Sequence, residues 1–417
     1  MRKSKMFWIG VIAGFFVMTL GLSGTAVAEE PIKIGFQSDY AKLVTIGPVL
    51  FQGFKDYIKV FESEGGKVEG HPIEFVECTH DYDVNRGLEC YQRQKMAGIV
   101  SLALYGTPHT YALTPKLTAD KIPAICAGFG RADAMDGTKF PYIFPVSATY
   151  WSQATAAVKY IQDAEGKENL KGVKIAYLYF DNPAGKEPMG VLEKLAKKFQ
   201  FKLRMFGVPS PGVEMGAQVT DITRRFKADW VIGHMFGRAP SVSLKELYRK
   251  GFPLDHYIAF VWNTFDTDVE AAGKDISKGC LTISYTGLGN DFPIHKKIKA
   301  LYEKEGKPVP EYFNKTGYYN RGIYWAGIQV EAVRMAIKHY GPPITGETVK
   351  KGYEKISGYT LGGLFPPLEL SENDHEGGGW VIVYQWDGEK FVLKKDWYKA
   401  HRDIIAEQLA EVNKAQK

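Results

Sequence analysis

The run Gly106-Thr107-Pro108-His109-Thr110 has the residue types and spacing best suited to bind a solute. It follows a β-rich stretch and opens a helical one, so the amide groups of its first turn have no partner within the helix. These amides and the neighbouring threonine hydroxyls suit an anionic group such as a carboxylate, and glycine permits close approach to the backbone. The same residues also fit an ordinary helix start, with Thr107 as a side-chain cap and Pro108 at the first helical position.

Further polar and aromatic residues stand where predicted strands end. In a parallel sheet whose strand order reverses, ligands bind beyond the carboxyl ends of the strands. The candidate ligand-binding residues at these ends are Ser38, Tyr105, Gly128, Phe129, Arg131, Tyr150, Asp181, His234, Phe236, Trp262 and Asn263. Several rings on one rim predict a pocket with flat apolar walls, although aromatic residues at strand ends also serve as core packing. Arg131 fits either a two-bond carboxylate clamp or a solvated charge at a helix start.

Sequence patterns of common catalytic sites are missing after residue 28. No Gly-rich loop ends in Gly-Lys-Ser or Gly-Lys-Thr, and neither His-Glu-x-x-His nor Gly-x-Ser-x-Gly occurs. Gly128-Phe129-Gly130 begins like a dinucleotide-binding turn, but Asp133 stands where a third small residue should pack. We therefore expect a binding protein that is not an enzyme and carries no cofactor.

The elements that position these residues alternate between short β-rich runs and amphipathic helical stretches. This alternation predicts α/β architecture, with parallel sheets and crossover helices on both faces. Strands are predicted at 32–36, 73–77, 99–105, 122–127, 142–146, 173–180, 201–206, 230–236, 257–262 and 280–285. A hairpin over 380–386 and 391–394 surrounds the turn signal Asp387-Gly388. Long helices are predicted at 293–305 and 320–340, and a shorter one at 345–356.

The N-terminus reads as a cleavable secretory signal. Arg2, Lys3 and Lys5 precede an apolar stretch that ends in the small residues Ala26-Val27-Ala28. A retained membrane anchor is the weaker interpretation, because the apolar stretch is short and contains three glycines. Cys78 is the first cysteine, so we do not expect a lipoprotein. We expect residues 1–28 to be a signal peptide and the mature protein to function outside the cytoplasm.

Length, charge and cysteines limit the function further. Residues 29–417 number 389, which suits two lobes better than one core, and their net charge of +3 gives no reason to expect nucleic-acid or direct membrane binding. Cys78 ends a predicted strand and Cys90 lies in the next helix, so these two are the candidate disulfide. Cys126 and Cys280 are expected to be buried thiols. A metal site at Cys78, His80, Asp81 and Asp83 is disfavoured because its ligands differ in softness.

Several short motifs occur in a characteristic order between Ile32 and about Lys394. They are Ile32-Lys33-Ile34-Gly35-Phe36, Gly47 with Gly53, Gly65-Gly66 with Gly70, Tyr142-Ile143-Phe144-Pro145, Asp229-Trp230-Val231, and Gln385-Trp386-Asp387-Gly388. In this order the chain resembles the periplasmic solute-binding proteins of branched-chain amino acid ABC transporters, the leucine/isoleucine/valine-binding type. The resemblance implies the type I periplasmic binding protein fold, in which two doubly wound lobes are joined by a three-crossing hinge. The lobes are expected at 29–146 plus 286–365 and at 147–285 plus 366–395, followed by a C-terminal helix at 396–417.

The resemblance also implies roles for single residues. Gly106, Thr107, His109 and Thr110 match the loop that holds the ligand carboxylate, and Gly128, Phe129 and Gly130 match the next turn on that side. Phe236 falls near a pocket aromatic of the family. Trp262 stands near the acid that grips an α-ammonium group, and Ala184 stands where the family often has tyrosine. These two departures favour an aromatic acid over an α-amino acid.

We therefore expect the extracytoplasmic solute-binding component of an ABC importer. It would bind a small carboxylate-bearing solute, an amino acid or an aromatic acid, by hinge closure, and deliver it as a monomer to an inner-membrane ABC permease. The alternatives are a secreted ligand sensor and a hydrolase of similar two-lobe architecture.

Overall fold

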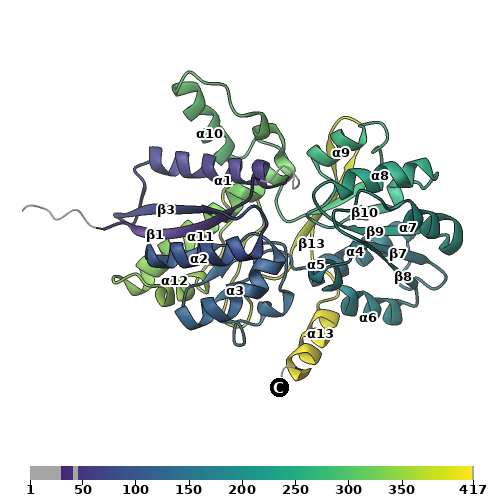
Figure 1. The fold of residues 1–417 in the computed structure, drawn as a ribbon, viewed down its shortest axis with the longest axis horizontal. Coiled ribbons are helices and arrows are strands. Elements are labelled where there is room, and N and C mark those ends of the chain that lie inside the picture. Colours follow the sequence, from purple (N-terminus) through teal and green to yellow (C-terminus); the bar gives the residue numbers. More distant parts are fainter. Residues whose placement is uncertain (1–29, 41–45, 416–417) are drawn as a thin grey trace, which may run out of the picture. The chain divides into compact units, whose positions relative to one another are not determined.

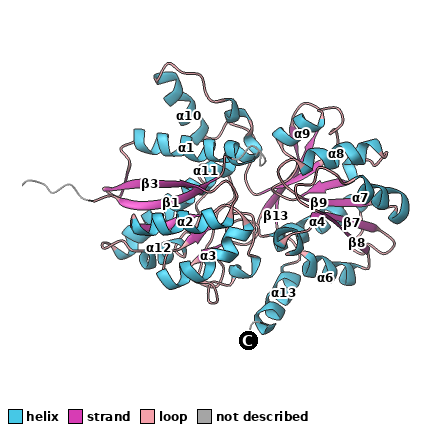
Figure 2. Ribbon diagram, viewed as in Figure 1, coloured by secondary structure: helices cyan, strands magenta, loops and turns pink. Residues whose placement is uncertain are grey.

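The computed structural model describes residues 30–40 and 46–415, which form two α/β lobes with mostly parallel sheets (Figures 1 and 2). The predicted signal peptide, residues 1–28, lies outside the described residues. The predicted fold class is confirmed. None of the helices in the described ranges combines the length and the apolar character that a membrane crossing needs.

The first lobe contains a six-stranded sheet in the order β2-β3-β1-β4-β5-β6. Its strands are β1 (Ile32–Ser38), β2 (Lys67–Val68), β3 (His71–Thr79), β4 (Ile99–Ala103), β5 (Ala124–Ile125) and β6 (Ile143–Phe144). β2 is antiparallel to β3, and the other pairs are parallel. Because β1 has β3 on one side and β4 on the other, the strand order reverses there and leaves a crevice beyond the carboxyl ends.

Helices cover both faces of this sheet (Figure 1). They and the short helical turns are α1 (Ile46–Ser63), α2 (Val84–Met96), α3 (Thr107–Asp120), η1 (Ala132–Met135), α10 (Pro293–Lys304), η4 (Glu311–Asn314), α11 (Thr316–Tyr340) and α12 (Gly346–Tyr353). The alternation of side chains along β1 explains the two layers. Phe36 stacks on Phe54 of α1 at a centroid distance of 4.4 Å, whereas Gly35 faces Gln94 of α2.

The second lobe contains a seven-stranded sheet in the order β13-β12-β11-β10-β9-β7-β8. Its strands are β7 (Lys174–Phe180), β8 (Lys202–Val208), β9 (Trp230–His234), β10 (Tyr257–Ala259), β11 (Leu281–Ser284), β12 (Val381–Trp386) and β13 (Phe391–Tyr398). β12 is antiparallel to both β11 and β13, and the remaining pairs are parallel. The order reverses between β7 and β9, which creates a second crevice beyond the carboxyl ends.

This sheet is also covered on both faces. Its helices and helical turns are α4 (Tyr150–Glu165), α5 (Pro183–Lys186), α6 (Met189–Phe199), α7 (Gly216–Thr220), η2 (Asp221–Phe226), α8 (Ala239–Arg249), η3 (Leu254–His256), α9 (Asp266–Ala272) and α13 (Arg402–Ala415). Ile175 and Tyr177 of β7 belong to one apolar cluster, and Ala176 and Leu178 to another, as the period of a strand buried on both sides requires. The C-terminal helix α13 packs on α6 of this lobe, where Lys194 lies 3.1 Å from Glu407.

The chain passes between the lobes three times. It leaves the first sheet after β6, returns after β11 to form α10, α11 and α12, and crosses again before β12. The returning helix α11 packs closely on α1. Gly322 permits this approach, because a side chain there would overlap the backbone oxygen of Leu50. These passages agree with the predicted three-crossing hinge.

Several element boundaries differ from the predictions. β5 and β6 have two residues each, although predicted strands covered 122–127 and 142–146, and β13 runs on to Tyr398. Helix α9 was not predicted. Thr107 does not cap α3: Gly106 is the N-cap residue, and no side chain makes a capping hydrogen bond. Gly106 has φ of 105°, a backbone conformation that favours glycine.

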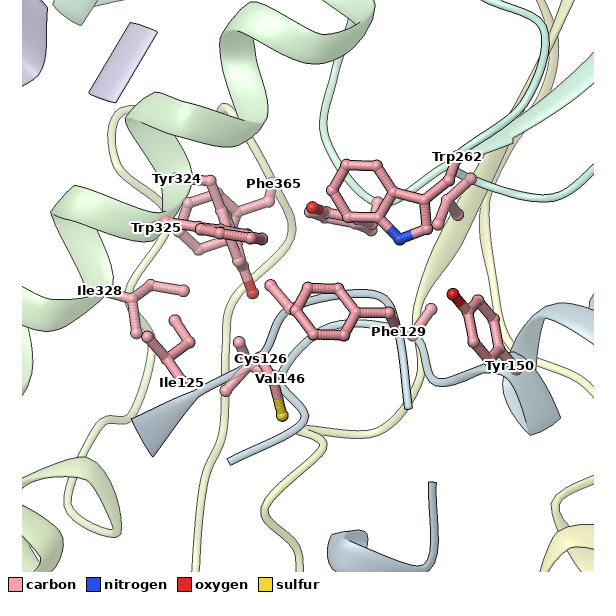
Figure 3. Packing of buried hydrophobic residues seen from close by; sticks show 14 of the residues in the cluster. Ile125, Cys126, Phe129, Val146, Tyr150, Trp262, Tyr324, Trp325, Ile328 and Phe365 are labelled. Carbon is pink, nitrogen blue, oxygen red and sulfur yellow. The ribbon is translucent and has the colours of Figure 1, made fainter. Parts of the chain in front are cut away.

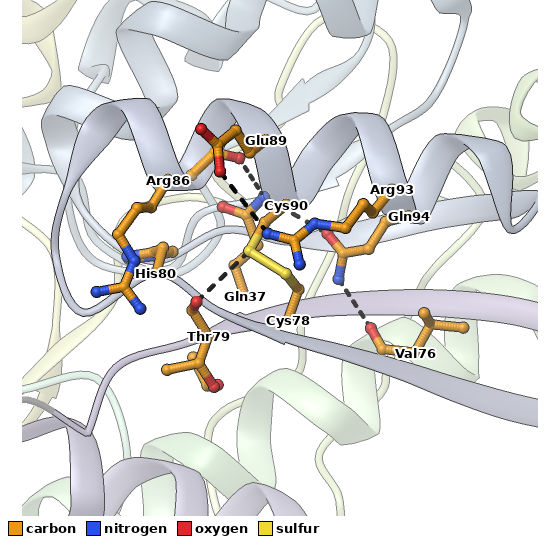
Figure 4. Close-up of a disulfide and its surroundings, with 12 residues drawn as sticks. Gln37, Val76, Cys78, Thr79, His80, Arg86, Glu89, Cys90, Arg93 and Gln94 are labelled. Carbon is orange, nitrogen blue, oxygen red and sulfur yellow. Dashed lines mark hydrogen bonds and ion pairs between the residues drawn. A yellow bond between two sulfur atoms is a disulfide. The ribbon is translucent and has the colours of Figure 1, made fainter.

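A disulfide joins Cys78 at the end of β3 to Cys90 in α2, the pair suggested by the sequence (Figure 4). It fastens α2 to the sheet, together with a 2.8 Å hydrogen bond from Gln94 Nε2 to the carbonyl of Val76. Two of the residues considered above as metal ligands are engaged in other contacts. The Cys78 sulfur is part of the disulfide, and His80 Nδ1 accepts a hydrogen bond from the Tyr82 amide. Cys126 and Cys280 are buried thiols.

Candidate functional site

A pocket lies where the carboxyl ends of the two sheets face each other. It holds about 310 Å³ of space not occupied by protein atoms, part of it open to solvent. The residues that line it are Ile46, Tyr82, Tyr105, Gly106, Thr107, Phe129, Tyr150, Phe236 and Trp262. They follow β1, β3, β4 and β5 in the first lobe and β9 and β10 in the second, with Tyr150 at the start of α4. The pocket therefore occupies both crevices that the strand orders predict.

Seven of the residues selected from the sequence meet in this lining: Tyr105, Gly106, Thr107, Phe129, Tyr150, Phe236 and Trp262. They come from segments up to 157 positions apart in the chain, between Tyr105 and Trp262. These residues lie close together because the carboxyl ends of parallel strands meet at a common edge of each sheet.

The chemistry of the lining is that of neutral hydrogen-bond donors and aromatic rings. No Asp, Glu, Lys or Arg is among the described residues that line the pocket. Burial raises the pKa of Tyr82, Tyr105 and Tyr150 above the usual range of a phenol, so each hydroxyl keeps its proton. The side chain of Thr107 lies close to the Tyr150 hydroxyl and opposes part of the rise in its pKa. Neutral hydroxyl donors of this kind suit an acceptor-rich group such as a carboxylate.

Trp262 forms one wall of the pocket and reaches across to the first lobe (Figure 3). Its indole Nε1 donates a hydrogen bond of 2.8 Å to the backbone oxygen of Gly128. The ring lies 5.9 Å from that of Phe129, centroid to centroid. Behind it lies the buried guanidinium of Arg321, 4.9 Å from the Trp262 ring centroid. Because its N–H group is engaged, Trp262 presents an apolar ring to the pocket.

His109 lies behind the pocket wall rather than in it. It is fully buried and stacks on His80 at 4.1 Å, and its ring meets that of Tyr82 edge-on. Burial lowers the pKa of His109, so the imidazole is neutral near pH 7. His109 supports Tyr82 in the lining instead of contacting a solute in the pocket.

Three other candidates are buried in the first lobe and do not line the pocket. Ser38 Oγ hydrogen-bonds with Thr79 Oγ1 at 2.8 Å. Thr110 Oγ1 donates to the carbonyl of Gly106, as a hydroxyl one turn into a helix does. The oxygen of Gly128 accepts from Trp262 and from Gln153, and a side chain at this glycine would overlap Tyr285.

Arg131 clamps a carboxylate of its own chain. Its Nε and Nη2 donate to the two oxygens of Asp133 at 2.8 and 2.6 Å. The guanidinium carbon also lies 3.9 Å from the centroid of Phe140. Neither interpretation made from the sequence anticipated this partner. Asp133 is within reach of the guanidinium because the local turn brings the two side chains together.

The remaining candidates of the second lobe also have partners elsewhere. Asp181 forms an ion pair of 2.6 Å with Lys186. His234 Nδ1 hydrogen-bonds with Tyr177 at 2.7 Å, and Asn263 Oδ1 accepts from Tyr257 at 3.2 Å. Of these three, His234 and Asn263 lie at the strand ends that carry Phe236 and Trp262, whereas Asp181 follows β7.

Two lining residues were missed. Tyr82 follows β3 in a turn with φ of 62° and belongs to a strand end, so the rule used for the other strands could have found it. Ile46 begins α1 and carries no signal in the sequence, because an aliphatic residue in an amphipathic helix is expected in the core.

Comparison with known proteins agrees with this geometry. The periplasmic binding protein family model matches residues 31–390. Among curated proteins, none is similar enough to match. A solved structure from the Pseudomonas fluorescens group, described as an ABC transporter permease, is 35% identical, with 92% of this chain and 96% of that chain covered and a TM-score of 0.85.

Two more distant structures share the fold. A branched-chain amino acid ABC transporter protein from Thermus thermophilus with bound valine is 20% identical, covers 89% of this chain and 97% of its own, and has a TM-score of 0.76. A solute-binding protein from R. palustris in complex with 4-hydroxybenzoate is 20% identical, covers 89% and 98%, and has a TM-score of 0.71. From the extent of the family match and the two-lobe fold around one pocket, the chain belongs to the periplasmic binding proteins.

Proposed function

We propose that this protein is the solute-binding component of an ABC importer and that its solute is a small aromatic carboxylate. The observation that carries the proposal is the pocket lining, which combines aromatic walls with neutral donors and contains no charged side chain among the described residues. An aromatic acid has the matching parts, a flat apolar ring and one acceptor-rich end.

The carboxylate would lie at the Gly106 and Thr107 end of the pocket. There the first turn of α3 presents amide groups, and the Thr107 and Tyr150 hydroxyls lie close by. The ring would lie between Trp262, Phe129 and Phe236, which form apolar walls from both lobes. Contacts from both lobes would stabilise the joined arrangement, and this supports binding by hinge closure.

An α-amino acid fits this lining less well. Its ammonium group needs an acceptor or a negative charge, and the lining supplies neither Asp nor Glu among the described residues. The relatives differ in this respect: one is in complex with 4-hydroxybenzoate and another carries bound valine. The pocket chemistry of this chain favours the aromatic acid.

The setting of the function is proposed on the sequence together with the family. We propose cleavage of residues 1–28, a periplasmic monomer, an inner-membrane permease as partner, and no catalysis. The proposed lobes are 29–146 plus 286–365 and 147–285 plus 366–395. Strands β1–β6 support the first range and β7–β12 the second, whereas β13 runs past residue 395 to Tyr398. The C-terminal helix was predicted at 396–417, but it begins at Arg402, because residues up to Tyr398 pair in β13; it is described as far as Ala415.

A thermal-shift panel tests the proposed solute class. Benzoate and 4-hydroxybenzoate should raise the melting temperature, benzamide less, and leucine and valine least, because a ligand at 100 times its Kd stabilises a folded protein by about 2.7 kcal/mol. A shift with leucine or valine and none with the aromatic acids would overturn the solute assignment. Chromatography of each solute after incubation should recover it unchanged, whereas a product would favour a hydrolase.

A further inference from the structure

We infer that Glu187 is a positioning residue that joins the two lobes beside the pocket and couples solute binding to the uptake of a proton. Glu187 lies between α5 and α6 in the second lobe, and it was not among the residues selected from the sequence. The inference rests on the proposed function, since it concerns how the lobes come together around the solute.

The side chain of Glu187 bonds to the first lobe. Its Oε1 accepts a hydrogen bond of 2.6 Å from the backbone amide of Ala132. The hydroxyl of Tyr111 in α3 lies 3.4 Å from Oε2 and donates to it. Gly130 leaves the room for this approach, because a Cβ atom there would overlap Glu187 Oε2. One carboxylate of the second lobe thus contacts two separate segments of the first.

The contact lies beside the pocket. The Cβ atom that would overlap Glu187 at Gly130 would also lie 2.9 Å from Cγ2 of Thr107, which lines the pocket. On the other side, Trp151 Nε1 donates a hydrogen bond of 3.1 Å to the backbone oxygen of Glu187. Trp151 follows Tyr150, another lining residue. Glu187 therefore lies next to the segments that carry Thr107 and Tyr150 of the lining.

The charges around Glu187 leave it without an ion-pair partner among the described residues. From the first lobe, Asp133, Arg131, Tyr111 and the Cys126 thiol face it. From the second lobe, the facing groups are Tyr150, Tyr177 and the neighbouring Lys186. Arg131 is engaged by both oxygens of Asp133, and Lys186 is engaged by Asp181 at 2.6 Å.

Burial between the lobes has a consequence for protonation. It raises the pKa of Glu187 to about 8, with the negative charge of Asp133 adding to the rise and the Ala132 amide opposing it. Separation of the lobes would expose the carboxyl to water and return its pKa towards the ordinary value for glutamate. At a pH between these two pKa values, Glu187 therefore takes up a proton when the lobes join. The associated stabilisation is lost as the pH rises through about 8.

Calorimetric titration with benzoate tests the coupling. Above pH 6 the benzoate stays ionised, so a change in affinity reports on the protein. Wild type should bind benzoate about tenfold more weakly at pH 9 than at pH 7, and at pH 7 it should take up close to one proton per ligand, measured from heats in buffers of different ionisation enthalpy. Glu187→Gln keeps an oxygen acceptor for the Ala132 amide but does not titrate, so its affinity should vary little with pH. Glu193→Gln, an exposed carboxylate on α6, is the matched control and should keep the wild-type pH dependence.

Small-angle scattering of the ligand-free protein separates this inference from the proposed function. Protonation of Glu187 favours the joined arrangement, so the radius of gyration of wild type should fall from pH 9 to pH 5, whereas that of Glu187→Gln should stay constant. If this difference appears but no solute binds, Glu187 is supported and the proposed function fails. If Glu187→Gln retains the wild-type pH dependence of both binding and the radius of gyration, or if wild type takes up no proton, the inference is overturned. A wild-type proton uptake supports it even where the variant folds poorly.

Discussion

Trp262 and Gly128 join the two lobes through a 2.8 Å hydrogen bond from an indole N–H to a backbone carbonyl. Trp262 follows β10 of the seven-stranded sheet, and Gly128 follows β5 of the six-stranded sheet. The bond holds the ring of Trp262 against the pocket, with Phe129 on the facing lobe (Figure 3). One side chain therefore both forms a wall of the site and connects the lobes that build it.

Trp262→Phe should weaken aromatic-acid binding about fivefold. Phenylalanine keeps an aromatic ring but cannot donate to Gly128, and a hydrogen bond of this kind contributes about 1 kcal/mol. Calorimetric titration with benzoate measures the change. Trp397→Phe in β13, outside the pocket lining, is the matched control and should bind like wild type. Equal affinities of Trp262→Phe and wild type would show that the bond does not stabilise the ligand-binding arrangement.

Thr107→Val should weaken binding of benzoate by about tenfold or more while preserving the shape of the side chain. It removes a hydroxyl at the proposed carboxylate end, and a hydrogen bond to a charged group contributes about 1.5–3 kcal/mol. Thr107→Ser keeps the hydroxyl and should retain most of the affinity. The affinity for benzamide, which is neutral, should fall less than that for benzoate. If Thr107→Ser and Thr107→Val lose affinity alike, the hydroxyl is not the group that binds the solute.

Gly130→Ala should reduce affinity, because the added methyl group cannot share space with Glu187 Oε2 when the lobes are joined. Combining it with Glu187→Ala removes the overlap and should restore part of the binding. This non-additivity is measured as a double-mutant cycle. Gly216→Ala, where the nearest atom to the added carbon is a flexible Glu246 oxygen at 3.6 Å, is the control and should leave binding unchanged. Additive effects of the two substitutions would contradict a direct contact between positions 130 and 187.

Replacing both Cys78 and Cys90 by alanine should lower the free energy of unfolding by about 2–4 kcal/mol. The bridge closes a loop over a sequence separation of 12 residues and fastens α2 to β3, away from the pocket lining (Figure 4). Urea unfolding monitored by circular dichroism measures the loss, while the affinity for solutes should stay near that of wild type. A reducing agent should destabilise wild type but not the double variant. An unchanged unfolding midpoint in the variant would show that the bridge does not stabilise the fold.

The alternation of apolar residues predicted the order of strands and helices well. A burial period of two residues predicts a strand, and one of about 3.6 residues predicts a helix. Both periods can be recognised within a short stretch of sequence. The boundaries were less accurate at β5 and β6. There the regular pairing is short, yet backbone bonds such as Cys126 N to Phe144 O extend beyond it.

The side chains at the strand ends divide according to contacts that no local pattern contains. Thr107 and His109 are two positions apart, but the first lines the pocket and the second stacks on His80 behind it. Arg131 is withdrawn from any solute by Asp133. Glu187 meets Ala132 across 55 positions of sequence.

By itself the sequence determined the family, the two-lobe α/β architecture and most of the rim on which the pocket is built. Parallel strands end at a shared edge, so knowledge of the strands locates that rim. Only the tertiary structure decided which rim residues face the pocket, that Tyr82 and Ile46 complete it, and that Glu187 bridges the lobes. The direction of a side chain and the partner it binds depend on segments distant in the chain, and packing selects among them only when both lobes are folded.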